Sequence, residues 1–236
     1  MVGELHNTLL IIADISGYTK FMTQTRVSIG HSQAIISELI NSILREVDIP
    51  LDTAKLEGDA VFIYAKKDTD WEQHKSVVSA KILRFFTLFT EKLAELVGSN
   101  LCSCNPCANA SNLKLKVIVH GGQALFYKIG KFEELAGPDV ITLHRLLKNT
   151  VNADHYLLLT DAAKNDLAID LPFTVHNEKY DVGDLTCHVH LFEPTPSTTD
   201  YSGASFKLKN AFLKTIKGIP GFLGRNGTHK QEAASH

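Results

Sequence analysis

The chain has 236 residues with a formal net charge of −2, and 44% of its residues are hydrophobic. This length suits one large domain, and the nearly neutral charge argues against a dedicated nucleic-acid binder with a basic face. No run approaches the roughly 20 apolar residues of a membrane-spanning helix, and the first eight residues lack the positive flank of a signal peptide. We therefore expect a cytoplasmic protein.

The amino-terminal part predicts a buried strand followed by a helix. Residues 9–13 are an uninterrupted apolar run that ends at Asp14 and is followed by Ser16-Gly17, a pattern typical of a central strand closed by a turn. Between residues 31 and 47, apolar side chains recur at helical spacing, which predicts an amphipathic helix. Pro50 then ends this helix.

A hairpin and a long helix come next. Residues 54–56 and 59–65 flank a tight Glu57-Gly58 turn, so we expect two paired strands with Asp59 opening the second. Residues 71–97 carry a stripe of apolar side chains that predicts a helix, which ends at Gly98-Ser99-Asn100.

The following segments alternate between strand and helix. We expect strands at residues 113–119 and 156–160, a helix at residues 139–148, and a late hairpin formed by residues 173–175 and 186–192. This order predicts an α+β domain, in which helices pack on one face of an antiparallel or mixed sheet.

The composition changes after Pro194. Residues 195–205 are rich in Pro, Ser, Thr and Gly, and predict a linker between a domain at residues 1–194 and a segment at residues 206–236. Residues 206–223 predict a basic amphipathic helix that would contact a membrane surface or a protein partner. The alternative is that this helix covers the protein's own sheet. Residues 224–236 are polar and predict disorder.

Two aspartates are candidates for a metal site. Asp14 ends the first strand and Asp59 begins the second strand of the hairpin, so neighbouring strands would project both carboxylates from one edge. Mg²⁺ prefers carboxylates combined with the phosphate oxygens of a substrate. The alternative is that both aspartates are ordinary turn residues beside Gly17 and Gly58.

Four segments resemble, in the same order, the motifs of the class III nucleotidyl cyclases. They resemble the first metal-binding strand, the second metal motif, the strand before the dimerisation region, and the transition-state helix. The segments are Ile12-Ala13-Asp14-Ile15-Ser16-Gly17-Tyr18-Thr19, Lys55-Leu56-Glu57-Gly58-Asp59-Ala60, Val119-His120-Gly121-Gly122, and Gly137-Pro138-Asp139-Val140 with Arg145-Leu146. The signature His144-Arg145-Leu146-Leu147-Lys148-Asn149 resembles an uncharacterised bacterial branch of this superfamily. The resemblance implies a ferredoxin-like α+β fold.

The resemblance also implies a metal-dependent function. Asp14 and Asp59 would hold two Mg²⁺ or Mn²⁺ ions, assisted by the backbone carbonyl of Ile15. These ions would activate a ribose 3′-hydroxyl and neutralise the triphosphate of a purine nucleotide.

Three further side chains take roles from the same resemblance. Lys55 and Glu134 fall where adenine-selective members read the base, and Arg145 falls on the arginine that supports the phosphates. The alternatives are a solvated Lys55 and Glu134, and an Arg145 in a surface ion pair. Ile141 stands where the family has an asparagine that orients the ribose, and losing such a donor typically costs about 10²–10³ in rate.

The cysteines predict a second metal site. Cys102, Cys104 and Cys107 form a close C-x-C-x-x-C group that suits tetrahedral Zn²⁺, with Cys187, His188 or His190 as candidates for the fourth ligand. The alternative is a group of thiols in a loop. We interpret His120, at the end of a predicted buried strand, as a hydrogen-bonded core residue.

Three functions are consistent with these patterns. The first is a homodimeric cyclase that converts ATP to a cyclic nucleotide, slowly because of Ile141, with each site shared between subunits. The second is a catalytically degenerate module that binds a nucleotide for signalling without turning it over. A zinc-stabilised interaction domain is the third.

Overall fold

The computed structural model describes residues 3–24, 29–98 and 104–193. The predicted linker, the amphipathic segment at 206–223 and the polar end all lie outside the described residues. Within them, the strands are β1 (Glu4–Ser16), β2 (Asp52–Glu57), β3 (Ala60–Lys66), β4 (Lys114–Ile129), β5 (Phe132–Ala136), β6 (Tyr156–Thr160), β7 (Thr174–Tyr180) and β8 (Gly183–Leu191). The helices are α1 (Tyr18–Gln24), α2 (Ile29–Leu44), α3 (Trp71–Gly98), α4 (Asn105–Asn109), α5 (Pro138–Leu146) and α6 (Asp161–Asp166).

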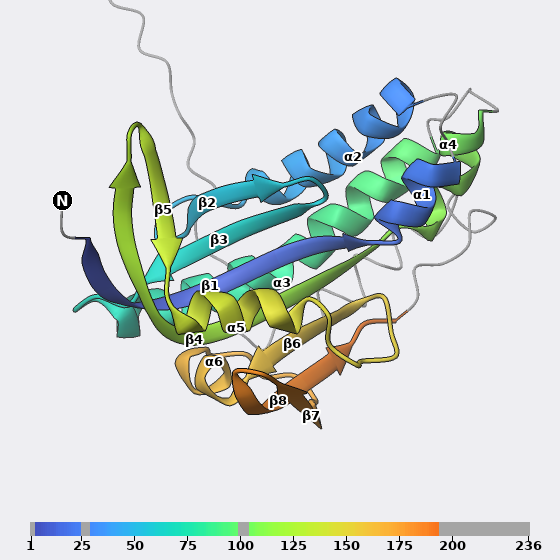
Figure 1. Cartoon of the computed structure of the whole chain (residues 1–236). Coiled ribbons are helices and arrows are strands. Elements are labelled where there is room, and N and C mark those ends of the chain that lie inside the picture. Colours follow the sequence, from blue (N-terminus) through green and yellow to red (C-terminus); the bar gives the residue numbers. More distant parts are fainter. Residues whose placement is uncertain (1–2, 25–28, 99–103, 194–236) are drawn as a thin grey trace, which may run out of the picture.

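The strands form one mixed sheet in the order β2-β3-β1-β4-β6-β8-β7, with β5 paired to β4. The β4–β6 pair is parallel, and the other pairs are antiparallel. The predicted α+β class with a mixed sheet is therefore confirmed. The structure extends the predicted strand at residues 113–119 into the much longer β4, which folds back through β5 as an arm at one side of the molecule (Figure 1).

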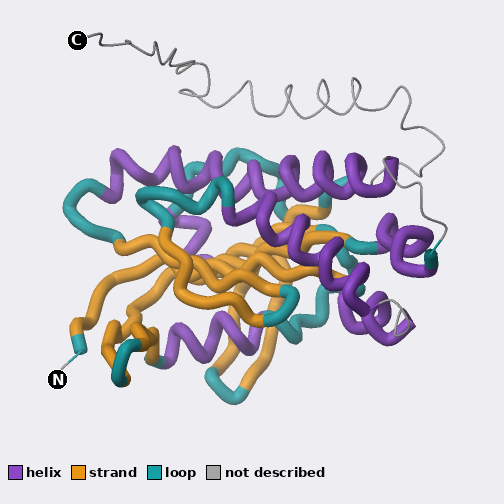
Figure 2. The backbone as a smooth tube through the Cα atoms, turned by 90° about the horizontal axis from the view of Figure 1, so that it is seen from above, coloured by secondary structure: helices purple, strands orange, loops and turns teal. Residues whose placement is uncertain are grey.

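Helices cover both faces of the sheet. The long helices α2 and α3 lie on one face, and α5 lies on the other (Figure 2). We had expected helices on one face only. The residues of β1 account for the difference: Leu9 and Ile11 belong to the core under α2 and α3, whereas Leu10 and Ile12 belong to the core under α5. A strand covered on both faces needs the uninterrupted apolar run that the sequence has.

Two consecutive glycines let helices approach both faces of β4. A Cβ on Gly121 would lie 2.5 Å from the Asp166 carboxylate and 3.2 Å from the backbone of Ala162, at α6. A Cβ on Gly122 would lie 2.3 Å from the Cγ of Asp139, at the start of α5. Side chains at these two positions would therefore displace the two helices from the strand.

His120 is a hydrogen-bonded core residue, as predicted. It is buried, its Nδ1 lies 3.0 Å from the hydroxyl of Thr160, and its Nε2 lies 3.2 Å from the Asp139 carboxylate. No helix within the described ranges is long and apolar enough to cross a membrane.

Candidate functional site

The two aspartates of the predicted metal site lie beside each other. Asp14 on β1 is paired in register with Ala60, the residue that follows Asp59. The backbone N–H of Ile15 donates to the backbone carbonyl of Asp59 over 3.1 Å, which holds the β2–β3 turn against β1. Gly58 has a φ of 70°, the left-handed conformation that a tight two-residue hairpin turn requires. The Glu57-Gly58-Asp59 sequence therefore forms the hairpin turn, in addition to supplying the candidate metal-site aspartate.

The carboxyl group of Asp59 is in an environment that disfavours its negative charge. Partial burial, followed by the nearby charge of Asp14, raises its pKa from 3.8 to about 6. The charge of Asp14 disfavours the ionised form of Asp59, and a divalent cation bound beside Asp59 would offset that penalty. Two neighbouring carboxylates are oxygen donors of the kind that Mg²⁺ or Mn²⁺ prefers.

This environment predicts a pH-dependent effect of Asp59→Asn in the presence of a chelator. Unfolded Asp59 ionises near 3.8 and folded Asp59 near 6, so between these values the folded state keeps a proton that the unfolded state has lost. As the pH rises from about 4 to 6, the folded wild-type protein loses the stability that it gained by keeping Asp59 protonated. The melting temperature of the variant should therefore rise relative to wild type between pH 4 and 6, and the difference should then stay constant.

Melting curves of both proteins across this range provide the test. A difference that is independent of pH, or one that shrinks as the pH rises, would contradict the assigned environment. In an Asp14→Asn background the pH range over which the melting-temperature difference changes should narrow. The charge of Asp14 is the second-largest cause of the raised pKa of Asp59, and the substitution removes it.

Lys116 is a third charged residue at this point, and the sequence analysis missed it. Its Nζ lies 2.9 Å from the Asp14 carboxylate, and only 19% and 15% of the two side chains are exposed. The Nζ also donates to the carbonyl of Leu147, just after α5. Lys116 stands opposite Asp14 on the neighbouring strand β4, so only the β1–β4 register could have revealed it. It places a cation directly beside the Asp14 carboxylate.

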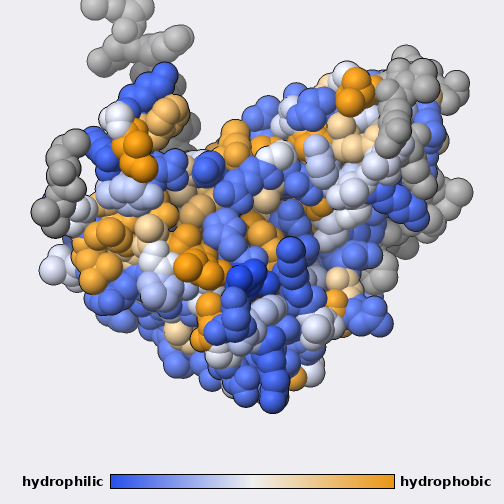
Figure 3. All heavy atoms as spheres, viewed as in Figure 1, coloured by the Kyte–Doolittle hydropathy of each residue, from blue (hydrophilic) through white to orange (hydrophobic). Residues whose placement is uncertain are grey.

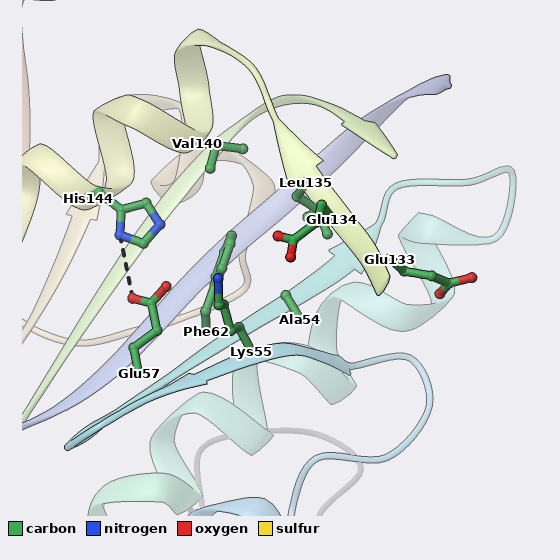
Figure 4. A pocket seen from close by; sticks show the side chains of 9 residues that line it. All are labelled: Ala54, Lys55, Glu57, Phe62, Glu133, Glu134, Leu135, Val140 and His144. Atoms are coloured by element: carbon green, nitrogen blue, oxygen red, sulfur yellow. Dashed lines mark ion pairs between the residues drawn. The ribbon is translucent and has the colours of Figure 1, made fainter. Parts of the chain in front are cut away.

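Lys55 and Glu134, the two predicted base-reading residues, line one pocket. The pocket lies between the β2–β3 hairpin, β5 and α5 (Figure 4). Its apolar wall comes from Phe62, Leu135 and Val140. The structure therefore brings together two side chains that are 79 positions apart in the sequence, a cationic donor and an anionic acceptor beside an apolar surface.

Glu57, Glu133 and His144 also line the pocket and were not assigned a role from the sequence. His144 on α5 places its Nδ1 3.8 Å from the Glu57 carboxylate and packs edge-on against the ring of Phe62 (Figure 4). Glu57 is the last residue of β2, directly before the turn that holds Asp59. The His144–Glu57 ion pair thus connects α5 to the hairpin that carries the metal-site aspartate.

Arg145 and Ile141 lie on α5, one turn apart. The Arg145 guanidinium donates to the Asp181 carboxylate over 2.9 Å, in an ion pair whose side chains are 49% and 65% exposed. Within the single chain, Arg145 therefore takes the surface ion pair that we considered as its alternative role. Ile141 is 51% exposed.

Exposed apolar side chains occur on the side of the molecule that carries the pocket. Besides Ile141, the β4–β5 arm exposes Ile129 and Phe132 on either side of its turn. In the space-filling view, hydrophobic surface gathers on the arm and at its base (Figure 3). Such patches often mark surfaces that bind another protein.

The cysteine group is only partly described, because Cys102 lies outside the described residues. Cys104 and Cys107 lie together, and the histidine beside them is His31 of α2, which the sequence analysis did not consider. Cys187 belongs to the core under α5, whereas Cys107 belongs to the core on the other face of the sheet. His188 lies 2.6 Å from Asp161, and His190 lies 2.8 Å from the carbonyl of Pro172. These three candidates for a fourth ligand are therefore not part of the group.

The fold of this domain occurs in solved structures of nucleotidyl cyclases. Solved structures with the same fold include a bacterial light-regulated adenylyl cyclase, with a TM-score of 0.59 and 13% identity, covering 92% of this chain and 58% of that one. The guanylyl cyclase Cya2 has a TM-score of 0.60 and 11% identity over 82% of this chain and 97% of that one. The adenylyl cyclase CyaB from P. aeruginosa has a TM-score of 0.57 and 9% identity over 84% of this chain and all of that one. The domain thus has the fold of a class III nucleotidyl cyclase catalytic domain, as the sequence motifs predicted.

The chain belongs to the family described as "Protein of unknown function (DUF2652)", which it matches over residues 36–156. It is also 31% identical over 126 residues to the uncharacterised protein Rv2561/Rv2562 of Mycobacterium tuberculosis. That match covers 53% of this chain and 57% of the mycobacterial protein, so the similarity spans a little over half of each.

Proposed function

We propose that this domain binds a purine nucleoside triphosphate together with divalent metal ions. The observation that carries the proposal is the pair Asp14 and Asp59, held side by side by the Ile15–Asp59 backbone hydrogen bond. With Mg²⁺ or Mn²⁺ bound, the two carboxylates and the Ile15 carbonyl would be the protein ligands. The ions would neutralise the triphosphate and lower the pKa of the ribose 3′-hydroxyl.

Lys116 would take a second role when metal and nucleotide are present. In the single chain its ammonium neutralises Asp14. Once metal ions carry out that neutralisation, the ammonium is available for a phosphate oxygen beside the same carboxylate. An ammonium on a flexible stem suits this exchange because it can change partners by a small rotation of its side chain.

The base would lie in the pocket that contains Lys55 and Glu134. Adenine presents a ring-nitrogen acceptor next to an amino donor, which matches a lysine donor and a glutamate acceptor. Guanine presents O6 as an acceptor next to its N1–H donor, which also matches the pair, so both nucleotides belong in the test. Phe62, Leu135 and Val140 supply the apolar surface that a flat purine requires.

The complete site would be formed by two copies of the chain. Arg145 pairs with Asp181 and is half exposed in the single chain, so it is accessible to a phosphate held by the aspartates of a second subunit. The exposed Ile129, Phe132 and Ile141 supply apolar surface for such a contact. A two-fold dimer would then contain two equivalent sites.

The second candidate function is nucleotide binding without turnover, and the observation that favours it is Ile141. Its side chain is half exposed on α5, one turn before Arg145, and cannot donate a hydrogen bond to a ribose. A site without this donor keeps its metal and phosphate contacts, so binding can persist where catalysis is slow or absent.

Incubation of the pure protein with ATP or GTP and either Mn²⁺ or Mg²⁺ separates the two functions. A cyclic nucleotide detected by mass spectrometry, and lost in Arg145→Ala, supports the cyclase. Unchanged nucleotide that nevertheless binds in calorimetry supports the binding module. A protein that neither binds nor converts any nucleoside triphosphate, as a monomer or a dimer, contradicts the proposal.

A further inference from the structure

His31, Cys104 and Cys107 form a compact cluster at the end of the molecule where α1, α2 and α4 meet (Figure 1). One ligand atom from each residue lies within 4.8 Å of those of the other two. The Sγ atoms of the two cysteines are 3.3 Å apart, and the Nδ1 of His31 lies 3.2 Å from Cys104 Sγ and 3.9 Å from Cys107 Sγ.

These separations match a metal coordination shell. In tetrahedral zinc sites the Zn–S bonds are about 2.3 Å and the Zn–N bonds about 2.0–2.1 Å, which places neighbouring ligand atoms roughly 3.5–3.8 Å apart. The three observed edges, 3.2, 3.3 and 3.9 Å, lie around that range. A single ion could therefore reach all three atoms with little movement of the side chains.

The three ligands come from two segments that are far apart in the sequence. Cys104 directly precedes α4 and Cys107 lies within it, so their C-x-x-C spacing sets the distance between the sulfurs. His31 lies in the first turn of α2. Cys107 is 5% exposed and packs in the core, whereas His31 is exposed. The cluster thus begins in the core and opens to the surface, which gives an ion a route to it.

We propose that His31, Cys104 and Cys107 bind one Zn²⁺ ion and thereby fasten α4 to the start of α2. Two thiolates and an imidazole are soft to borderline ligands that select zinc over Mg²⁺ or Mn²⁺. This site is therefore chemically distinct from the carboxylate pair of Asp14 and Asp59. Among the described residues the site supplies three ligands, and tetrahedral zinc takes a fourth. The proposal does not rest on the proposed nucleotide function.

The zinc ion would also support the end of β1 from outside. Gly17 follows β1, and a Cβ added there would lie 3.5 Å from the backbone carbonyl of Asn112, close after α4. The carboxylate of Asp14 is three residues before Gly17. Fixing α4 therefore holds the segment against which the end of β1 rests, and a structural role for the ion is expected.

Metal analysis of the full-length protein, purified without chelators, is the first test. We expect close to one zinc per chain, and a Co²⁺-substituted protein that shows thiolate-to-cobalt charge-transfer absorption. His31→Gln and Cys104→Ser should both lower zinc affinity in a chromophoric chelator competition. Since losing even an outer partner of a ligand costs about 10–100-fold in metal affinity, losing a ligand should cost at least as much.

His190→Gln and Cys187→Ala are matched controls, because each removes the same ligand type outside the cluster. Both should keep the wild-type zinc content and affinity. The proposal would be overturned if the purified protein contained no zinc, or if Cys104 and Cys107 formed a disulfide in metal-free protein as purified. It would also be overturned if His31→Gln and His190→Gln bound zinc with equal affinity.

Discussion

Asp14→Asn should remove the metal dependence of nucleotide binding. Wild-type protein is expected to bind ATP or GTP more tightly with Mn²⁺ than with a chelator, because both carboxylates then hold ions that also bind the phosphates. The variant keeps Lys116, Lys55 and Glu134, so it should retain only the weaker, metal-independent binding. Loss of one of two carboxylate ligands should weaken Mn²⁺-dependent binding by on the order of 10–100-fold or more. Titration calorimetry with and without Mn²⁺ measures the difference.

Asp184→Asn is the matched control for this experiment. Asp184 is an exposed carboxylate on β8, 3.6 Å from Lys179, and lies outside the proposed site. Its loss changes the net charge by the same amount and should leave metal-dependent binding unchanged. If Asp14→Asn and Asp184→Asn bind the metal–nucleotide complex as tightly as wild type, Asp14 is not a metal ligand.

Gly122→Ala should destabilise the domain strongly. The added Cβ would lie 2.3–2.6 Å from the Cγ, Oδ2 and Cβ of Asp139. The Cβ of Asp139 is fixed to the backbone of α5, so it cannot rotate away from the new atom. Asp139 also accepts the backbone N–H of Gln123 over 2.7 Å and contacts His120, so its displacement would break these two interactions. We expect a loss of about 3 kcal/mol, in the range typical of overpacking. For a chain of this size that lowers the melting temperature by roughly 6–12 °C.

Gly30→Ala is the matched control. Gly30 lies in α2, and a Cβ there would meet nothing within 4 Å. Alanine also has the higher helix propensity, so this variant should be as stable as wild type or slightly more stable. If thermal denaturation gives Gly122→Ala the same melting temperature as Gly30→Ala, α5 does not pack on β4 as closely as the structure has it.

Local patterns in the sequence were sufficient for most of the elements near the site. The apolar run at residues 9–13 correctly predicted a buried central strand, and the turn at Gly58 correctly predicted the β2–β3 hairpin. The β5 strand was not predicted. Its sequence, Phe132–Ala136, has two acidic residues among five and no fully buried residue, and it pairs with β4 as part of an arm, so neither alternation nor burial marks it.

The sequence indicated which residues are candidates for the site, but it did not indicate which other side chains they contact. Motif order pointed to Asp14, Asp59, Lys55 and Glu134, and the structure brings these into two adjacent groups. Lys116 was missed because its role depends on the β1–β4 register, which no local pattern encodes. His31 was missed for a similar reason, since 73 residues separate it from Cys104.

A crystal structure with Mn²⁺ and a non-hydrolysable ATP analogue tests the central claim most directly, because anomalous scattering locates manganese independently of the protein density. The account predicts manganese bound by both Asp14 and Asp59, with two ions about 4 Å apart if the full metal pair forms. The Lys116–Asp14 ion pair should be broken or lengthened, and the base should lie between Lys55 and Glu134. A bound nucleotide with no manganese at these carboxylates, and with Lys116 still paired to Asp14, would contradict the account.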